Sequence, residues 1–139
     1  MGIPKFLNFN LMLFSVGLTI VGCAAATYED KILHAGAVKL LAPEMRARYV
    51  GNTLSGTTPD GVAFDVYIAS KRNFSMLYKN EKSTGTWRID ENGMFCGKLG
   101  GGDELCSREY FSRNTITSIN VDGSLAGTAR IIAGNPKGL

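Results

Sequence analysis

The sequence predicts a mainly β protein: an antiparallel up-and-down meander that closes into a small barrel or half-barrel, with one short N-terminal helix. Two observations predict this class. Beyond Gly51, short stretches of alternating apolar and polar residues recur between turn-forming Gly, Asn and Asp residues. The connections between the stretches are short, which favours antiparallel pairing of neighbours. Closure then removes the unpaired edges that such a sheet would expose.

The helix is expected over residues 39–50. Leu41, Met45 and Tyr49 recur at helical spacing and form one apolar stripe. Gly51 suits the position just after the helix, where a left-handed backbone is common. We expect this helix to close one end of the barrel or to cover a sheet edge.

The expected strands follow the helix in order, separated by turn residues. Thr58–Gly61 forms a turn before the first strand, residues 80–84 form a polar turn, and Asn92-Gly93 and Asp122-Gly123 are typical hairpin signals. The strands are expected at residues 62–69, 74–78, 85–89, 94–99, 104–113, 115–121 and 125–133.

Large apolar residues of these strands are expected to face the barrel interior, with Trp87 as a core anchor. Small barrels fill their interiors with side chains, whereas carrier barrels leave a cavity. We expect this set to be sufficient to fill the barrel: Phe64, Val66, Phe74, Met76, Trp87, Ile89, Ile119 and Ile131.

A segment typical of protein export precedes the domain. Lys5 is followed by an apolar run over residues 11–26, which is short for a membrane span and has the length of a secretory signal. Ile20-Val21-Gly22-Cys23 resembles the lipobox of bacterial lipoproteins. The resemblance implies cleavage before Cys23 and lipidation of its thiol. Cleavage after Ala26, at an A-x-A-like site, is the alternative.

The chain therefore divides into a signal peptide at residues 1–22, a lipidated cysteine with a tether at 23–37, and a single β-barrel-like domain at 38–139. We expect the mature protein to be lipid-anchored on the periplasmic side of the cell envelope. Ala24 follows the cysteine where an Asp resembles an inner-membrane retention signal. Its absence favours the outer membrane.

Two cysteines remain once Cys23 carries the anchor. In an exported chain, the even pair Cys96 and Cys106 indicates a disulfide bond. A metal site is the alternative, but zinc takes four N, S or O ligands, and the single histidine, His34, lies in the expected tether. We expect neither a metal nor a cofactor.

Short motifs within the domain resemble an uncharacterised proteobacterial family of small exported β-rich domains. The motifs are Gly51-Asn52-Thr53, Gly85-Thr86-Trp87 and the pair Cys96 and Cys106, and the resemblance covers about residues 38–133. It implies a fold and no activity. A more distant likeness links the G-x-W strand and the single disulfide to bacterial lipoprotein metalloprotease inhibitors, which are also small barrels.

Charge and motif content argue against several functions. Lys5 is the one charged residue before Cys23, so cleavage leaves a net charge one lower than the +3 of the whole chain, which does not predict nucleic-acid binding. No catalytic residues are assigned, and an envelope hydrolase is the least favoured function. The carboxylates considered for it lie almost all at turns, where Asp has an ordinary structural role: Asp60, Asp65, Asp90, Glu91, Asp103, Glu104 and Asp122.

The predicted function is a non-enzymatic protein-interaction module of the cell envelope, as an inhibitor or an assembly accessory, whose partner is an unknown envelope protein. A candidate binding rim combines cations and an aromatic near strand ends. The alternative is a lipocalin-like carrier of a small apolar ligand, which a cavity of roughly several hundred Å³ would favour. The residues of the rim are Lys71, Arg72, Tyr78, Lys79 and Arg88.

Overall fold

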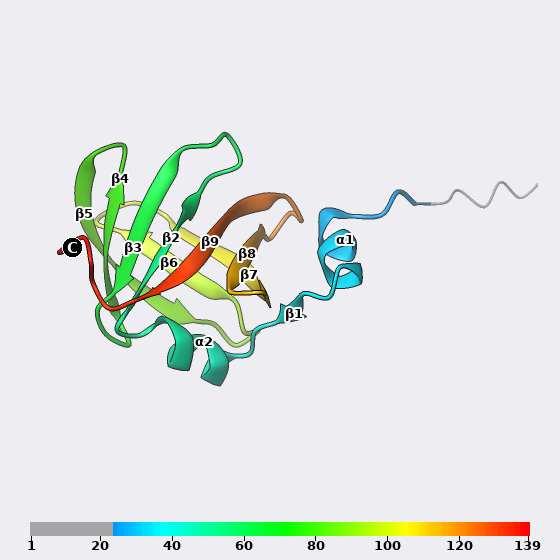
Figure 1. Ribbon diagram of the computed structural model, residues 1–139, viewed down its shortest axis with the longest axis horizontal. Coiled ribbons are helices and arrows are strands. Elements are labelled where there is room, and N and C mark those ends of the chain that lie inside the picture. The colour runs from blue at the N-terminus through cyan, green and yellow to red at the C-terminus, as the bar shows by residue number, and fades with distance from the viewer. Residues whose placement is uncertain (1–23) are drawn as a thin grey trace, which may run out of the picture.

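The computed structural model describes residues 24–139, which form a closed antiparallel barrel with one additional short strand and two helices (Figure 1). The elements in chain order are α1 (Tyr28–His34), β1 (Val38–Lys39), α2 (Ala42–Tyr49), β2 (Asn52–Thr57), β3 (Ala63–Ile68), β4 (Asn73–Tyr78), β5 (Glu81–Ile89), β6 (Phe95–Leu99), β7 (Glu104–Ser112), β8 (Thr115–Asn120) and β9 (Leu125–Ala133).

Strands β2 to β9 close the barrel. Each pairs with its sequence neighbour, and β9 also pairs with β2, which completes the ring of eight strands. Strand β6 pairs only with the first part of β7, and β1 then occupies the same edge of β7, opposite Tyr110 and Phe111. The predicted barrel is therefore confirmed, and its closure leaves no long unpaired edge among residues 24–139.

Three strands differ from the sequence-based expectation. Strands β1 and β2 both precede the first strand that was expected, and β1 includes Lys39, which was assigned to the helix; the helix itself begins at Ala42. Strand β5 begins at Glu81 rather than at Gly85. The turn before β5 needs only Lys79 and Asn80, both with positive φ, at 50° and 64°. This tight geometry matches strand twist in hairpins, so the polar residues that follow continue the strand and do not form the expected turn.

Helix α2 closes one end of the barrel, as expected (Figure 1). The Met45 and Tyr49 side chains are completely buried and belong to the interior apolar cluster with Phe74 and Trp87. At the start of the helix, the Leu41 N–H donates to the Glu44 carboxylate at 2.8 Å, which satisfies one of the free N–H groups there. The apolar stripe predicted from the sequence is thus the face that packs on the barrel.

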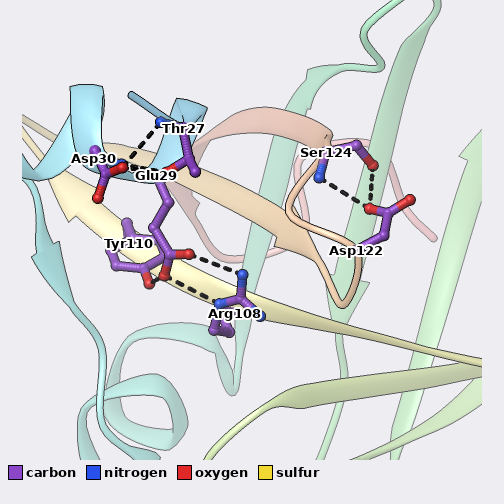
Figure 2. Close-up of polar contacts among 7 residues, drawn as sticks. All are labelled: Thr27, Glu29, Asp30, Arg108, Tyr110, Asp122 and Ser124. Carbon is purple, nitrogen blue, oxygen red and sulfur yellow. Dashed lines mark hydrogen bonds and ion pairs between the residues drawn. The ribbon is translucent and has the colours of Figure 1, made fainter. Parts of the chain in front are cut away.

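Helix α1 lies beside the barrel within the segment expected to be a tether. Thr27 and Asp30 form a reciprocal capping box at its start. Glu29 then reaches β7, where its carboxylate accepts hydrogen bonds from the Arg108 guanidinium at 2.9 and 3.1 Å and from the Tyr110 hydroxyl (Figure 2). Within residues 24–139, neither helix has the length and apolarity needed to cross a bilayer.

Candidate functional site

The barrel interior contains a cavity of about 510 Å³. It extends from Tyr49 of α2 to the hairpin that joins β6 and β7 and to the start of β9. The expectation that large side chains fill this barrel is therefore wrong. A volume of this size lies within the range of roughly 300–1,000 Å³ that is typical of small-molecule sites.

Large apolar side chains form most of the cavity wall. They come from β2, β3 and β4, which are neighbours in the sheet, and from β6, which pairs with β7. Such a wall offers dispersion contacts and no specific charge to most of a ligand's surface. The large apolar residues of these four strands that line the cavity are Leu54, Phe64, Val66, Phe74, Met76, Phe95 and Leu99.

Small residues at inward-facing positions explain why the interior is not filled. A Cβ added at Gly97 would make ordinary van der Waals contacts with the ring edges of Phe95 and Phe74, at 3.6 and 3.7 Å, so this position could hold a side chain and instead holds none. Ser118 of β8, another small residue, also lines the cavity. These small inward-facing residues are missed when only the large apolar residues are considered.

Ile119 does not contribute to the interior, although the alternation of β8 suggested that it would. It lies opposite Arg108 in the β7–β8 register, and Arg108 extends to Glu29 on the outside of the barrel. The preceding residue, Ser118, lines the cavity instead. The pairing of β8 with β9 is irregular between Ser118 and Ile119. Ile119 is fully buried, but outside the interior cluster.

Trp87 is a core anchor, as expected. Its ring stacks on Phe95 with the centroids 5.4 Å apart, and its indole N–H donates to the Ser70 carbonyl at 2.9 Å. Buried Trp usually finds such a partner for its N–H. Phe95 lines the cavity and Trp87 does not, so the indole packs against a residue of the cavity wall without lining the cavity itself.

One carboxyl group lies in the cavity wall. Glu109 of β7 is 3% exposed and accepts three hydrogen bonds from hydroxyl groups. Its Oε1 accepts from the Ser107 hydroxyl at 2.6 Å, and its Oε2 accepts from Ser118 at 2.9 Å and from Tyr49 at 3.0 Å. All four residues line the cavity, so α2, β7 and β8 meet at this polar group.

Burial controls the protonation of this group. Removal from water raises the pKa of the Glu109 carboxyl, and the hydrogen bonds from Ser107, Ser118 and Tyr49 oppose that shift. Burial, together with the charge of Glu109, also raises the pKa of the Tyr49 hydroxyl well above its ordinary value. Tyr49 therefore stays protonated and remains a hydrogen-bond donor.

The cavity mouth lies at the hairpin between β6 and β7. Leu105 pairs with Gly97, and both line the cavity, yet the Leu105 side chain is 76% exposed. Leu99, on the other strand of the hairpin, is 37% exposed and also lines it. Gly102 and Asp103 at the hairpin tip complete this part of the wall. Apolar side chains thus border solvent where the cavity ends.

The five residues of the expected binding rim are not brought together. Lys71 and Arg72 lie between β3 and β4, whereas Tyr78 and Lys79 lie at the opposite end of β4. Arg88 of β5 is engaged in an ion pair with Glu104 at 2.5 Å. The expected patch of cations and aromatics is therefore divided between the two ends of the barrel.

The cysteine pair forms the predicted disulfide bond. Cys96 and Cys106 lie directly opposite each other on β6 and β7, with their Cα atoms 4.0 Å apart. A carboxylate oxygen of Asp90 and the two sulfur atoms lie within 4.8 Å of one another, close enough for a shared metal ion to be considered. The sulfurs are bonded to each other, however, so neither is a free thiolate ligand. Cys23, the expected site of lipidation, lies outside the described residues.

Glu109 is the functional residue that the sequence reasoning missed. The carboxylates considered there lie mostly at turns, whereas Glu109 lies in the middle of a strand. The signal that identifies it is the alternation of β7. Ser107 and Phe111 share its face, and Phe111 packs on the interior cluster. A carboxyl group at such a position is costly unless it is hydrogen-bonded.

No described protein family, curated protein or solved structure matches this chain. The cavity and its buried carboxyl group are therefore the features from which a function is inferred.

Proposed function

We propose that this protein is a carrier of a small, largely apolar ligand, which it holds inside the barrel. The observation that supports the proposal is the cavity of about 510 Å³ with its apolar wall. Sites for small molecules are typically concave and mostly apolar, with a few polar groups that orient the ligand. Glu109 and the three hydroxyls around it are groups of this kind.

An apolar cavity of this size is energetically unfavourable when no ligand occupies it. Side chains that face a void lack the dispersion contacts that close packing gives. The Phe64, Phe74 and Phe95 rings border the cavity. A ligand with an apolar body restores those contacts, which gives the binding its driving force.

The carrier function is preferred to the protein-interaction module because the features expected for the latter are separated. Lys71 and Arg72 are at one end of the barrel, and Tyr78 and Lys79 are at the other. Within residues 24–139, the ionisable groups that line the cavity are Tyr49, Asp103 and Glu109. These are suited to orienting a ligand, and we propose binding rather than catalysis.

The proposal includes a location. The lipobox-like segment that ends at Cys23 would place the carrier on the periplasmic side of a membrane, with the outer membrane favoured. The disulfide between Cys96 and Cys106 supports an exported protein, because such bonds persist in oxidising compartments. A tethered carrier would remain close to the membrane, which is where apolar molecules accumulate.

A cavity-filling substitution tests the carrier function. In Gly97→Ile the Cβ meets the Phe74 and Phe95 rings at ordinary contact distances, the rest of the side chain extends into the cavity that Gly97 lines, and β-branched residues suit a strand. We expect the affinity for the uncharged probe N-phenyl-1-naphthylamine to fall at least about tenfold. The measurement is energy transfer from Trp87, the one tryptophan of the chain, to the bound probe, with full-length protein purified from bacterial envelopes.

The matched control is Lys98→Ile, which adds the same side chain at the neighbouring, exposed position of β6. This variant is expected to bind the probe as the unmodified protein does. Equal probe affinity in a folded Gly97→Ile variant would contradict the proposed carrier function, as would a complete absence of probe binding by the unmodified protein.

A further inference from the structure

The charges in the cavity wall are of one sign. Glu109 and Asp103 carry carboxyl groups, and within the described part of the chain no Lys, Arg or His lines the cavity. Arg108, the chain neighbour of Glu109, is bound to Glu29 outside the barrel. Arg48, the neighbour of Tyr49, lies over the Phe111 ring at 4.1 Å from its centroid. The cations next to Glu109 and Tyr49 in the chain are thus engaged elsewhere.

The hydrogen bonds of Glu109 leave it one unused acceptor position. An ionised carboxylate has about four lone-pair sites, and three are occupied by the hydroxyls of Ser107, Ser118 and Tyr49. Hydroxyl donors stabilise the carboxylate but do not neutralise its charge. A buried charge without a counter-ion is unfavourable, so a cationic group at this point would be strongly favoured.

We infer that the ligand of this cavity is an amphiphile with an apolar body and a cationic amine head, which pairs with Glu109 while its body lies against the apolar wall. The inference rests on the proposed carrier function and specifies its ligand class. The same wall disfavours a fatty acid, because a second carboxylate would be placed near Glu109 with no basic side chain to pair with it.

Three ligands with the same alkyl chain separate the contribution of the head group to the affinity from that of the apolar body. Decylamine, decanol and decanoate are each used to displace N-phenyl-1-naphthylamine from the full-length protein, again with energy transfer from Trp87. We expect decylamine to bind at least about tenfold more tightly than decanoate, since a hydrogen bond to a charged group is stronger than one between neutral groups. Decanol is expected to bind with intermediate affinity.

The Glu109→Gln variant assigns the preference to one residue. Gln retains the shape and an acceptor oxygen but carries no charge. We expect this variant to lose the preference for decylamine over decanoate, measured as the ratio of the two affinities within the variant. The control is Glu91→Gln, the same substitution at an exposed turn residue outside the cavity, which is expected to keep the preference.

The pH dependence of binding by the unmodified protein is a second test that needs no variant. The titratable group facing Glu109 from α2 is Tyr49, and Asp103 is the other carboxyl in the wall. Because burial raises the pKa of Glu109, decylamine should bind more tightly as rising pH ionises this carboxyl. Decanol affinity should stay constant over the same interval.

The outcomes distinguish the inferred amine ligand from the proposed carrier function. If decanol and the probe bind but decylamine is not preferred, or if Glu109→Gln keeps the preference, the assignment of an amine ligand is wrong and the carrier function stands. If neither the probe nor decanol binds, both are wrong. Decanoate binding more tightly than decylamine would overturn the inferred ligand class directly.

Discussion

Glu109 is the residue whose properties depend most on its neighbours. An isolated Glu is ionised at neutral pH, but burial in the barrel wall favours the protonated form. Hydroxyl donors from Tyr49, Ser107 and Ser118 partly compensate by bonding to its oxygens. These opposing effects, with burial the larger, leave the pKa raised. The protonation of Glu109 therefore depends on side chains from α2, β7 and β8.

This raised pKa predicts how stability depends on pH. The folded chain retains the Glu109 proton to higher pH than the unfolded chain does, so unfolding releases a proton between the ordinary value of 4.5 and the raised value. The contribution of Glu109 to the free energy of unfolding is therefore fully present below 4.5 and is lost as pH rises through the raised pKa. Glu109→Gln removes this contribution.

The measurement is urea unfolding of the unmodified protein and of Glu109→Gln across a pH series. The difference in free energy of unfolding, unmodified minus variant, should decline as pH increases from acidic to neutral. Glu91→Gln, whose carboxyl is exposed, is the control and should give no such decline. A difference that is constant, or that increases with pH, would show that the carboxyl is not held protonated by burial.

Glycines show at the same scale why the cavity could not be predicted. A Cβ at Gly85 would lie 2.5 Å from the Phe74 ring, so this glycine permits close packing. At Gly97 the same atom would meet only ordinary contacts, so this glycine leaves space. Both glycines occupy inward-facing positions in strands whose apolar and polar residues alternate, so the sequence pattern does not distinguish them. Only the positions of the side chains around each one decide whether it closes or opens the interior.

At the scale of elements, α1 illustrates how a segment without an apolar stripe acquires a defined position. The helix is 7 residues long and has no buried residue, so packing contributes little and isolated helices of this length are marginal. Its contact with the barrel is polar, through Glu29 with Arg108 and Tyr110 (Figure 2). The side chains of the Glu29–Arg108 pair are 25% and 22% exposed, so solvent screens this pair less than a surface pair.

Removal of the Glu29 carboxylate should release α1 from the barrel. In Glu29→Ala, Arg108 and Tyr110 lose their shared partner, and we expect proteinase K to cleave within residues 27–37 about tenfold faster, as expected for the loss of a charged hydrogen bond. The barrel should unfold at nearly the same temperature. Limited proteolysis with mass spectrometry measures the first effect, and thermal unfolding measures the second.

Lys31→Gln is the control on the same helix, because Lys31 is exposed and its substitution leaves the contact with β7 intact. Its cleavage rate should match that of the unmodified protein. Equal protection of the helix in Glu29→Ala would show that the carboxylate does not hold α1 in place.

The strands show which local sequence patterns predict turns correctly and which do not. The turns at Asn92-Gly93 and Asp122-Gly123 were correctly predicted, and each glycine has the positive φ that its turn requires, at 76° and 88°. At Asp122 the turn is completed by hydrogen bonds from Ser124 to its carboxylate (Figure 2). The predicted start of β5 was wrong because the polar residues at the beginning of this strand resemble a loop in composition.

At the scale of the whole molecule, ring closure creates the cavity. The pairing of β2 with β9 brings residues 52 and 133 together, and the β7–β8 and β8–β9 pairings complete the wall around Glu109. Helix α2 closes one end, whereas the apolar residues Leu99 and Leu105 border the other. The cavity therefore extends between α2 and the hairpin that joins β6 and β7.

The tethered location makes a prediction about the intact protein in cells. If Cys23 is lipidated, metabolic labelling with an alkyne-bearing palmitate analogue in a bacterial host should mark the mature chain, and Cys23→Ala should abolish the label. Cleavage before Cys23 would also shorten the chain to its mature N-terminus, which mass spectrometry measures. An unlabelled mature chain that begins after Ala26 would favour the plain secretory alternative and would remove the membrane tether from the proposal.

The sequence by itself determined the fold class, helix α2 and the disulfide, because alternation, helical periodicity and an isolated cysteine pair are local signals that persist in the folded state. The tertiary structure alone decided that the barrel contains a cavity and that Tyr49, Ser107 and Ser118 surround Glu109 in its wall. Interior volume is the space left after residues far apart in the chain have packed, and the pKa of Glu109 depends on burial by those same residues. Neither quantity is a property of any single segment.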